Sequence, residues 1–285
     1  MSEGGGQGAA GRAGLAPGGG QGAADRRAGS VPVTVVIAAH NEAHHIAECI
    51  ESVSWADEVL VVENDSSDDT IAQAESAGAA AFSHPFTSIG GQRNAAIARA
   101  TRPWILVVDA DERGTPALGE AVATAVRDAG RDAYRVPRRN VFLGREIRHG
   151  GWGRDRPVRL FRSHLRYDER PVHEHVITTE EPGVLTEALW HRPYTSLDQY
   201  FSKLSRYSRD WARQHHARGR RVSVAMLLMR PQLRVFTTLV LRGGWRDGAR
   251  GVILAVLAGV SVAAKYAHLW ALGDGEPAED PWRGA

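Results

Sequence analysis

Apolar runs alternate with helix-like segments through the first half of the chain. Three runs are nearly all apolar and rich in β-branched residues, at 33–38, 58–62 and 104–108. Such runs are typical of strands buried on both faces of a sheet. Segments with helical patterns lie between and after them, at 43–53, 70–77, 91–100 and 117–128, and a further short strand is predicted at 79–82. This alternation predicts a mostly parallel sheet with helices on both faces.

The pattern changes after residue 132. Short strand-like runs lie among glycine-rich turns at 133–137, 158–161 and 173–177. Helical spacing then dominates in 196–214, 222–241 and 251–272, and the last two segments are apolar. The glycine- and alanine-rich start, 1–30, has no apolar run and predicts a disordered tail rather than a secretory signal. We therefore expect an α/β domain at 31–195, a helical extension at 196–272 and a loose tail at 273–285.

Basic residues are concentrated in the predicted helical extension. The formal net charge of the chain is only +2, yet residues 203–265 contain thirteen Lys or Arg and two acids. A basic and apolar segment suits the anionic surface of a membrane. The uncharged run 251–264 is shorter than the about twenty residues that a spanning helix needs, and Arg242, Arg246 and Arg250 precede it. This pattern predicts a helix in the membrane interface, with the protein attached peripherally from the cytoplasm.

Two further features bear on the compartment and the partners. The single cysteine, Cys49, excludes an intrachain disulfide and is typical of a reducing cytoplasm. Nucleic-acid binding by the basic stretch requires stacking aromatic residues or a known module. Tyr200, Tyr207 and Trp211 stand at helical spacing, which favours a packing stripe. We therefore expect no nucleic acid among the partners.

Three of the buried strands are each followed by a polar cluster. The clusters are residues 40–42 (His-Asn-Glu), 63–65 (Glu-Asn-Asp) and 109–112 (Asp-Ala-Asp-Glu). The carboxyl ends of parallel strands meet at one edge of a sheet, where ligands bind. Carboxylates crowded at such an edge repel each other unless a cation compensates them, and hard cations such as Mg²⁺ or Mn²⁺ prefer oxygen ligands. The sequence therefore predicts a divalent cation that bridges the diphosphate of a nucleotide.

Other nucleotide-binding classes lack their motifs in this chain. No G-x-G-x-x-G follows the first strand, which makes a dinucleotide-binding dehydrogenase a poor fit, and no G-x-x-x-x-G-K-[ST] is present, which excludes a P-loop enzyme. The glycine-bearing segment 88–94 is too short for a P-loop. Its Arg93 is nevertheless placed to reach a phosphate or the sugar of a bound nucleotide.

Four motifs stand in a fixed order along the α/β domain, at 38–42 (Ala-Ala-His-Asn-Glu), 62–70, 91–94 (Gly-Gln-Arg-Asn) and 109–112. Together they resemble family 2 glycosyltransferases with the GT-A fold. Four more motifs resemble a bacterial subgroup that includes lipopolysaccharide core glucosyltransferases, at 149–152, 159–162, 172–174 and 243–248. The resemblance covers residues 31–272. It implies an α/β, Rossmann-like, mostly parallel sheet of the nucleotide-diphospho-sugar transferase type with a helical C-terminal extension.

The resemblance also implies an activity. Members of this family are inverting enzymes that take a sugar from a nucleoside diphosphate donor, often a uridine diphosphate sugar, with Mg²⁺ or Mn²⁺ as cofactor. The implied acceptor is a cell-envelope glycan or glycolipid, such as lipopolysaccharide core, at the inner face of the cell membrane. Two alternatives remain open. A sugar nucleotidyltransferase also joins an α/β sheet to acidic metal sites, and a catalytically inactive protein of this kind is a sugar-nucleotide-binding scaffold.

The resemblance assigns roles to single residues. The positions that match the nucleotide site are Ala39, Asn41, Glu42, Glu63, Asp65 and Asp109. The positions that match the metal site are Asp109, Asp111 and a distal histidine, His191. Glu174 matches the region of the catalytic base, which takes a proton from the acceptor hydroxyl, and His173 is its rival. Glu63 departs from the family pattern, which usually has Asp there, so the resemblance does not fix the nucleobase.

Two residues further along the chain are candidates for contacts with the substrates. Trp152 offers a ring that suits the apolar face of a sugar, and Arg159 offers a charge for the leaving diphosphate. Each candidate also has an ordinary structural interpretation. Trp152 then belongs to the core, Arg159 to an ion pair, and Glu174 to a pair with an arginine such as Arg170. His191 is then an ordinary buried histidine.

Overall fold

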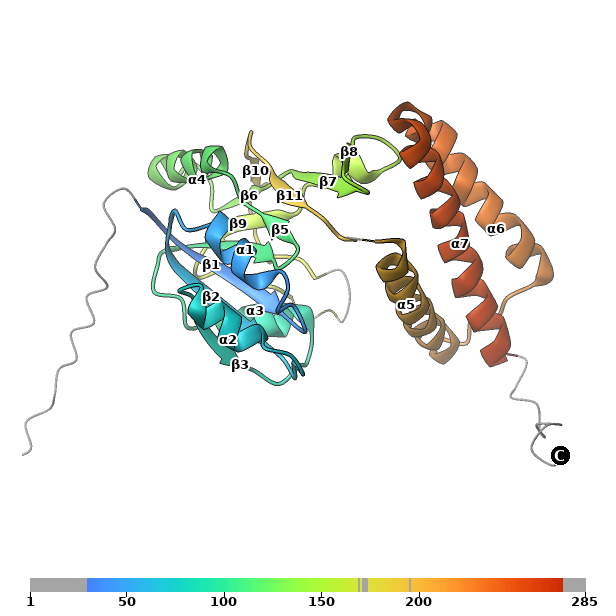
Figure 1. The fold of residues 1–285 in the computed structure, drawn as a ribbon, viewed down its shortest axis with the longest axis horizontal. Helices are drawn as coiled ribbons and strands as arrows, with labels where there is room; N and C mark the ends of the chain where they lie inside the picture. Colours follow the sequence, from blue (N-terminus) through green and yellow to red (C-terminus); the bar gives the residue numbers. More distant parts are fainter. Residues whose placement is uncertain (1–29, 169, 171–173, 195, 274–285) are drawn as a thin grey trace, which may run out of the picture.

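The computed structural model describes residues 30–168, 170, 174–194 and 196–273, and its first part is an α/β domain (Figure 1). The main sheet has seven strands in the order β10-β6-β9-β4-β1-β2-β3. Their bounds are β1 Val31–Ala39, β2 Ala56–Glu63, β3 Ala80–Ser83, β4 Trp104–Asp109, β6 Ala133–Arg135, β9 Val158–Arg162 and β10 Gly183–Val184. Strand β1 pairs in parallel with β2 and β4, and β2 pairs in parallel with β3. The predicted parallel sheet is thereby confirmed.

The central strands are apolar throughout because both of their faces are buried. Successive side chains of a strand point to opposite faces, so β4 contributes Leu106 and Val108 to one core cluster and Ile105 and Val107 to another. The helices of this domain are α1 Ile46–Ser52, α2 Thr70–Ser76, α3 Ile89–Ile97 and α4 Pro116–Asp128. Helices α1 and α4 pack against the first cluster, and α3 packs against the second.

Helix α3 begins two residues earlier than the sequence pattern predicts. The Ser88 hydroxyl accepts a hydrogen bond from the Gly91 N–H at 3.0 Å, which caps the first turn. Helix α4 begins in the same way, since the Thr115 hydroxyl accepts from the Leu118 N–H at 3.1 Å. Both caps lie at the starts of helices that flank the candidate site.

A second, four-stranded sheet was not predicted. It has the order β5-β11-β7-β8, with bounds β5 Glu112–Arg113, β7 Arg138–Phe142, β8 Arg145–Ile147 and β11 Leu189–His191. Strands β5, β8 and β11, with two or three residues, are too short to show a period-two pattern, and the five residues of β7 do not alternate between polar and apolar. The strand expected at 173–177 is wrong over its described part, where Val176 forms only an isolated bridge with Tyr167. His173 lies outside the described residues.

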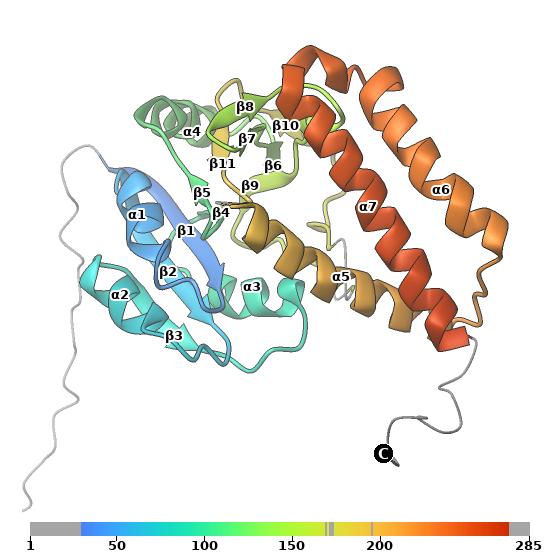
Figure 2. The same ribbon diagram turned by 45° about the vertical axis from the view of Figure 1, so that its right-hand side comes forward.

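Three long helices form the C-terminal part, with bounds α5 Leu197–Ala217, α6 Val224–Phe236 and α7 Gly248–Gly273. A π-helical segment, Thr237–Leu241, continues α6, and a short 3-10 turn, Gly244–Asp247, leads into α7. Helix α7 lies between α5 and α6 in two views (Figure 1, Figure 2). The Tyr200 hydroxyl of α5 donates to the Leu257 carbonyl of α7 at 3.1 Å, which ties the two helices together.

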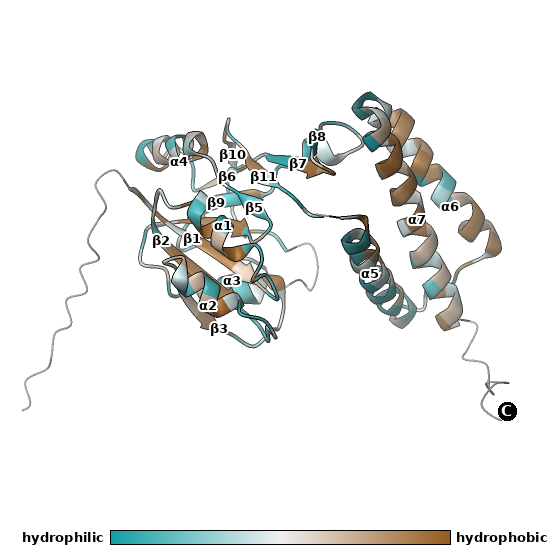
Figure 3. Cartoon of the chain, in the orientation of Figure 1, coloured by the Kyte–Doolittle hydropathy of each residue, from teal (hydrophilic) through white to brown (hydrophobic). Residues whose placement is uncertain are grey.

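The apolar character of this part is unevenly distributed (Figure 3). Helices α6 and α7 are largely apolar, whereas α5 is mostly hydrophilic. By length and composition, the segments Val224–Leu241 and Gly244–Gly273 are each able to cross a membrane, and only 6% and 28% of their apolar windows are buried. The aromatic stripe of α5 packs in part. Tyr200 is buried and the Trp211 ring lies 5.5 Å from that of Tyr266, but Tyr207 is half exposed.

Candidate functional site

The three polar clusters meet at one edge of the main sheet, as the sequence predicts. Ala39 pairs in register with Glu63, and Ala38 pairs with Asp109, so β1, β2 and β4 end side by side. The loops after β1 and β2 are joined by side chains. The Ser67 N–H donates to the Asn41 side-chain oxygen at 2.8 Å, which places this predicted nucleotide residue in a loop-to-loop contact. Both loops are therefore held in a fixed relation at the sheet edge.

Glu63 and Asp65, two of the predicted nucleotide-site residues, lie in the same region. The buried Glu63 carboxylate accepts hydrogen bonds from the Ser66 N–H at 2.9 Å and from the Ser83 hydroxyl. Burial alone would raise the pKa of Glu63, but these hydrogen bonds hold that pKa below its usual value. Asp65 is exposed and has a left-handed backbone, with φ +46°. Glu63 thus supports the loop that presents Asp65.

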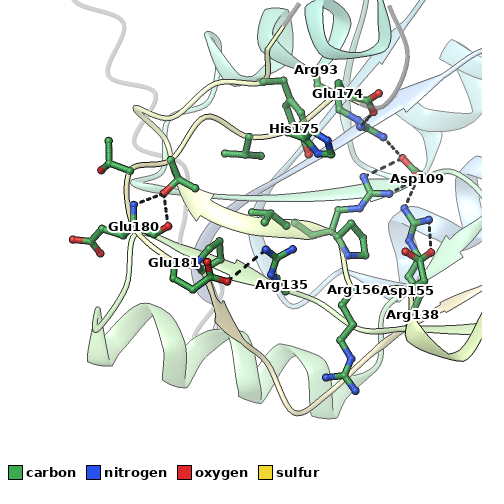
Figure 4. Close-up of a pocket in the computed structure, with 18 residues that line it drawn as sticks. Arg93, Asp109, Arg135, Arg138, Asp155, Arg156, Glu174, His175, Glu180 and Glu181 are labelled. Carbon is green, nitrogen blue, oxygen red and sulfur yellow. Dashed lines mark hydrogen bonds and ion pairs between the residues drawn. The ribbon is translucent and has the colours of Figure 1, made fainter. Parts of the chain in front are cut away.

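Asp109 lies in a cluster of arginines (Figure 4). Its carboxylate pairs with Arg93 at 2.5 Å, with Arg138 at 3.3 Å and with the buried Arg159. Burial alone would raise the pKa of Asp109, but Arg159, Arg93 and Arg138 hold it well below its usual range. Arg138 also contacts the fully buried Glu112 at 2.7 Å. Arg159 is therefore an ion-pair partner in this structure, which is the structural interpretation left open above.

Glu174 joins the same cluster from a distant part of the chain. Its carboxylate accepts from Arg93 at 2.5 Å and not from Arg170, which pairs with Asp168 at 3.0 Å. Gly90 makes this approach possible, since a Cβ there would lie 2.5 Å from the Asp168 carbonyl oxygen and 3.4 Å from the Glu174 Cβ. Arg93 thus bridges Asp109 and Glu174, the residue predicted to be the catalytic base. Arg93, Asp109 and Glu174 line a cavity of about 740 Å³.

Asp111 faces a different set of groups. Its carboxylate lies 3.5 Å from the Nε2 atom of His191, which strand β11 brings beside β5. The Nδ1 atom of His191 lies 2.6 Å from the Asn140 side-chain oxygen, and the Asn140 amide donates to the Trp152 carbonyl at 2.7 Å. The amide orientation gives Nδ1 the proton. The Nε2 atom then faces the Asp111 carboxylate, and a cation placed between these two groups would have a ligand on each side.

The residues present fit a divalent cation with an incomplete set of protein ligands. One carboxylate oxygen and one imidazole nitrogen suit Mn²⁺, with the remaining positions open to diphosphate oxygens. Within the described ranges, no group of three or more His, Cys, Asp or Glu is arranged around a common point. Asp109 has arginine partners in this structure, so its role as a metal ligand remains a prediction. Glu42 lies close enough to Asp111 that burial and this carboxylate together raise the pKa of Glu42.

The sequence pattern missed two of the site residues. Arg138 and Asn140 stand on β7, in the sheet that was not predicted, and each contacts a predicted site residue. Neither belongs to a motif that marks it. Trp152 is half buried, with its ring 6.1 Å from that of Phe142 and 6.5 Å from that of Tyr194. It nevertheless borders a second cavity of about 430 Å³ that His191 also lines.

Comparisons with known proteins agree on the family. The family model described as glycosyl transferase family 2 matches residues 34–191, more than half of the chain. The lipopolysaccharide core biosynthesis glycosyltransferase LpsC of Rhizobium meliloti is 30% identical over 251 residues, which cover 85% of this chain and 91% of that protein. An uncharacterized glycosyltransferase of Rickettsia felis is 28% identical over 209 residues, 67% of this chain and 72% of that protein.

Solved structures match over shorter stretches. A glucosyl-3-phosphoglycerate synthase from Mycobacterium tuberculosis, crystallised with Mn²⁺ and uridine diphosphate, has a TM-score of 0.34 and 23% identity. That match covers 40% of this chain and 45% of the solved chain. A mannosyl-3-phosphoglycerate synthase from Rubrobacter xylanophilus has a TM-score of 0.35 and 24% identity, over 38% and 40% of the two chains. By the family match over residues 34–191 and the relative that covers most of its length, the chain belongs to glycosyl transferase family 2, and it is a glycosyltransferase with an α/β domain of the GT-A type.

Proposed function

We propose that this glycosyltransferase transfers a sugar, with inversion, from a nucleoside diphosphate sugar to a cell-envelope glycolipid. The observation that carries the proposal is the pair formed by Asp111 and His191 at the sheet edge, 3.5 Å apart and beside the ends of β1 and β4. A uridine diphosphate sugar is the proposed donor. The proposed acceptor is a lipopolysaccharide core-like glycan, and the named relative from Rhizobium meliloti supports that choice.

The metal is proposed to be Mg²⁺ or Mn²⁺, held by Asp111 and His191. When bound, such a cation offsets the negative charge on the leaving diphosphate. Ala39, Asn41, Glu42, Glu63, Asp65 and Asp109 surround the same edge and are proposed to bind the nucleotide. Arg93 and Arg159 hold Asp109 in a fixed position, so a ribose hydroxyl would meet an oriented carboxylate.

Glu174 is proposed to be the general base. An inverting transfer is a single displacement at the anomeric carbon, and the acceptor hydroxyl attacks only as its proton is removed. Glu174 borders the large cavity together with Asp109, and its contact with Arg93 keeps its carboxylate at the wall. Trp152 borders the adjoining cavity on the His191 side, where its ring is available to an acceptor sugar.

The three C-terminal helices are proposed to attach the enzyme to the inner face of the membrane. Large apolar side chains are exposed along α6, among them Leu228, Met229 and Leu233 at 62%, 72% and 56%. Helix α5 lies against α7 and is rich in charged side chains, which a bilayer core does not accommodate. A spanning α7 would carry α5 to membrane depth. A helical layer that lies in the interface fits both helices, with α6 toward the lipid.

The membrane proposal is tested by vesicle flotation of the full chain. Leu228→Asp combined with Met229→Asp is expected to lower the partition coefficient at least about tenfold, because two apolar side chains no longer enter the lipid. The matched control is Val184→Asp combined with Ile177→Asp, which introduces the same two charges at side chains that are 52% and 61% exposed in the catalytic domain. Equal binding by the double variant and the original chain would refute the attachment through α6.

The role of Asn140 gives a separate prediction. Asn140→Ala removes the acceptor that orients His191, so we expect the apparent affinity for Mn²⁺ to fall about 10- to 100-fold. Activity should recover at high Mn²⁺ concentration, because the two proposed ligands remain. The measurement is the initial rate of sugar transfer as a function of Mn²⁺ concentration. A rate that falls equally at every concentration would mean that Asn140 acts on the fold and not on the metal site.

The function itself is tested by thermal unfolding with a panel of nucleotide sugars, with and without Mn²⁺. A ligand that binds the native state raises the melting temperature in proportion to the logarithm of its concentration over its dissociation constant. We expect a Mn²⁺-dependent rise with one uridine diphosphate sugar. A rise with a nucleoside triphosphate and with no nucleotide sugar would favour a sugar nucleotidyltransferase. No rise with any nucleotide would favour the scaffold alternative.

A further inference from the structure

A cavity of about 500 Å³ lies where two turns of the chain meet. One turn is 148–154 in the catalytic domain, and the other is 240–246 between α6 and α7. The Gly150 N–H donates to the Arg242 carbonyl at 3.0 Å, and the Asp247 carboxylate accepts from the His149 N–H at 2.8 Å. These bonds fix one turn on the other, so the cavity is a built part of the fold.

Arginines line this cavity without enough counter-charge. Arg148 pairs with Glu146 at 2.8 Å. Asp247, the acid beside the turn, pairs with the ring of His149 at 3.0 Å. Within the described part of the chain, no carboxylate pairs with the three remaining arginines of the lining, which are Arg154, Arg242 and Arg246. Like charges around one cavity repel each other, and a bound anion relieves that repulsion.

The backbone of the first turn is shaped to admit one of these arginines. Gly151 has a φ of +102°, which a residue with a side chain rarely adopts. A Cβ at this position would lie 2.9 Å from the Nη1 atom of Arg242. Glycine at 151 therefore lets the Arg242 guanidinium lie against the turn that also carries Arg154.

The rim of the cavity is apolar and faces the proposed membrane layer. Val240, Leu241 and Trp245 line the cavity and are exposed by 48%, 68% and 59%. Leu241 is also the last residue of the apolar segment Val224–Leu241. A site that combines guanidinium groups with an apolar rim suits an anion attached to a lipid better than a free, fully hydrated ion.

The cavity also adjoins the proposed catalytic region. Gly151 and Arg154 line both this cavity and the second cavity, which holds His191. Asp155 in turn lines both the second cavity and the large one, which holds Glu174. Shared lining residues thus connect the apolar helices with the two sides of the active site.

We propose that the cavity between turns 148–154 and 240–246 binds the phosphate group of a lipid-linked, phosphorylated acceptor. Three guanidinium groups that pair with no carboxylate of the described residues match a doubly charged tetrahedral phosphate, which accepts several charge-assisted hydrogen bonds at once. One of them, that of Arg246, also lies 5.5 Å from the centre of the Trp245 ring. The phosphate then fixes the acceptor at the membrane side while its glycan reaches toward His191 and Glu174. The role as an acceptor site rests on the proposed function, whereas phosphate binding itself does not.

The proposal is tested by calorimetric titration of the full chain with decyl phosphate below its micelle concentration. Arg242→Gln combined with Arg246→Gln is expected to weaken decyl phosphate binding about tenfold or more. The control is Arg127→Gln combined with Arg131→Gln, which removes the same charge from exposed positions at the end of α4 and just beyond it. We expect the control to change the dissociation constant less than about twofold. Equal affinities for the two double variants would overturn the proposal.

Two further titrants identify the source of the phosphate. Decyl maltoside has the same chain without the charge, and equally tight binding of this compound would overturn the anion site. Inorganic phosphate has the charge without the chain, and binding as tight as that of decyl phosphate would overturn the lipid-linked assignment. Thermal shifts with nucleotide sugars are measured on the same variants and are expected to be unchanged. If the unaltered chain gives no such shift, the proposed function fails while the phosphate titration still decides the cavity.

Discussion

Asp111→Asn is expected to lower the rate of metal-dependent sugar transfer at least about 100-fold. The substitution keeps the size of the side chain but removes the charge that a hard cation requires. In the structure Asp111 is the carboxylate that faces the Nε2 atom of His191, so no other acid is paired with that nitrogen among the described residues. The measurement is the initial rate of release of the nucleoside diphosphate, with saturating donor and a series of Mn²⁺ concentrations.

The matched control for this experiment is Asp69→Asn. Asp69 lies at the same sheet edge, is exposed, and makes no side-chain bond to the helix that it precedes. We expect the Asp69→Asn variant to stay within about twofold of the original rate, since an exposed carboxylate with no ion-pair partner among the described residues contributes little. A near-normal rate for Asp111→Asn would remove the metal from this position. Loss of activity in both variants would instead point to the net charge of the edge.

The sheet and its ligand-binding edge were predictable because the deciding pattern is local. The runs 33–38 and 104–108 are apolar on both faces, and only buried parallel strands explain such runs together with the helices between them. Parallel pairing then brings Ala38 beside Asp109 without any knowledge of side-chain contacts. The family motifs stand at the ends of the same strands, so the hydrophobic pattern and the family resemblance both indicated the same edge of the sheet as the ligand site.

The partners of the site residues were not predictable, because long-range packing decides them. Arg93 and Glu174 are 81 positions apart, and they meet because Asp168 and Glu174 lie against Gly90 at the start of α3. Asn140 reaches His191 through β7 and β11, strands of five and three residues. The three residues of β11 are too few for a readable period, and the five residues of β7 do not alternate between polar and apolar. The sequence alone therefore indicated which residues are chemically suited, and the fold determined which of them share a contact.

In the apolar C-terminal extension, too, the sequence predicted the helices but not the contacts between them. The uncharged run 251–264 was judged too short to span a bilayer, but α7 extends over 26 residues and the apolar segment around it over 30. Lys265 ends the uncharged run but not the helix, since lysine is a good helix former. Its ammonium group lies 5.8 Å from the centre of the Trp211 ring of α5. Length alone thus permits a crossing. The contact with the charged helix α5 is what favours attachment in the interface, and no sequence pattern contains that contact.

Glu174→Gln is expected to leave donor binding within about twofold and to lower the transfer rate about 10²- to 10⁴-fold, the usual contribution of a general base. The glutamine keeps the shape and one acceptor oxygen for Arg93, so the wall of the cavity is preserved. If Glu174 were only a structural residue, the substitution would lower the donor affinity and the melting temperature together with the transfer rate. Donor binding is measured by thermal shift, and transfer is measured by initial rate.

The control is Glu180→Gln, which changes an exposed acid on the wall of the same cavity that has no ion-pair partner among the described residues. We expect Glu180→Gln to keep both the transfer rate and the affinity for the donor. A normal rate for Glu174→Gln together with inactive His173→Ala would transfer the role of base to the histidine. Because Arg93 also binds Asp109, Arg93→Lys should resemble neither variant, since a single ammonium cannot bridge both carboxylates. It is therefore expected to weaken donor binding and transfer together, which separates positioning by Arg93 from proton removal by Glu174.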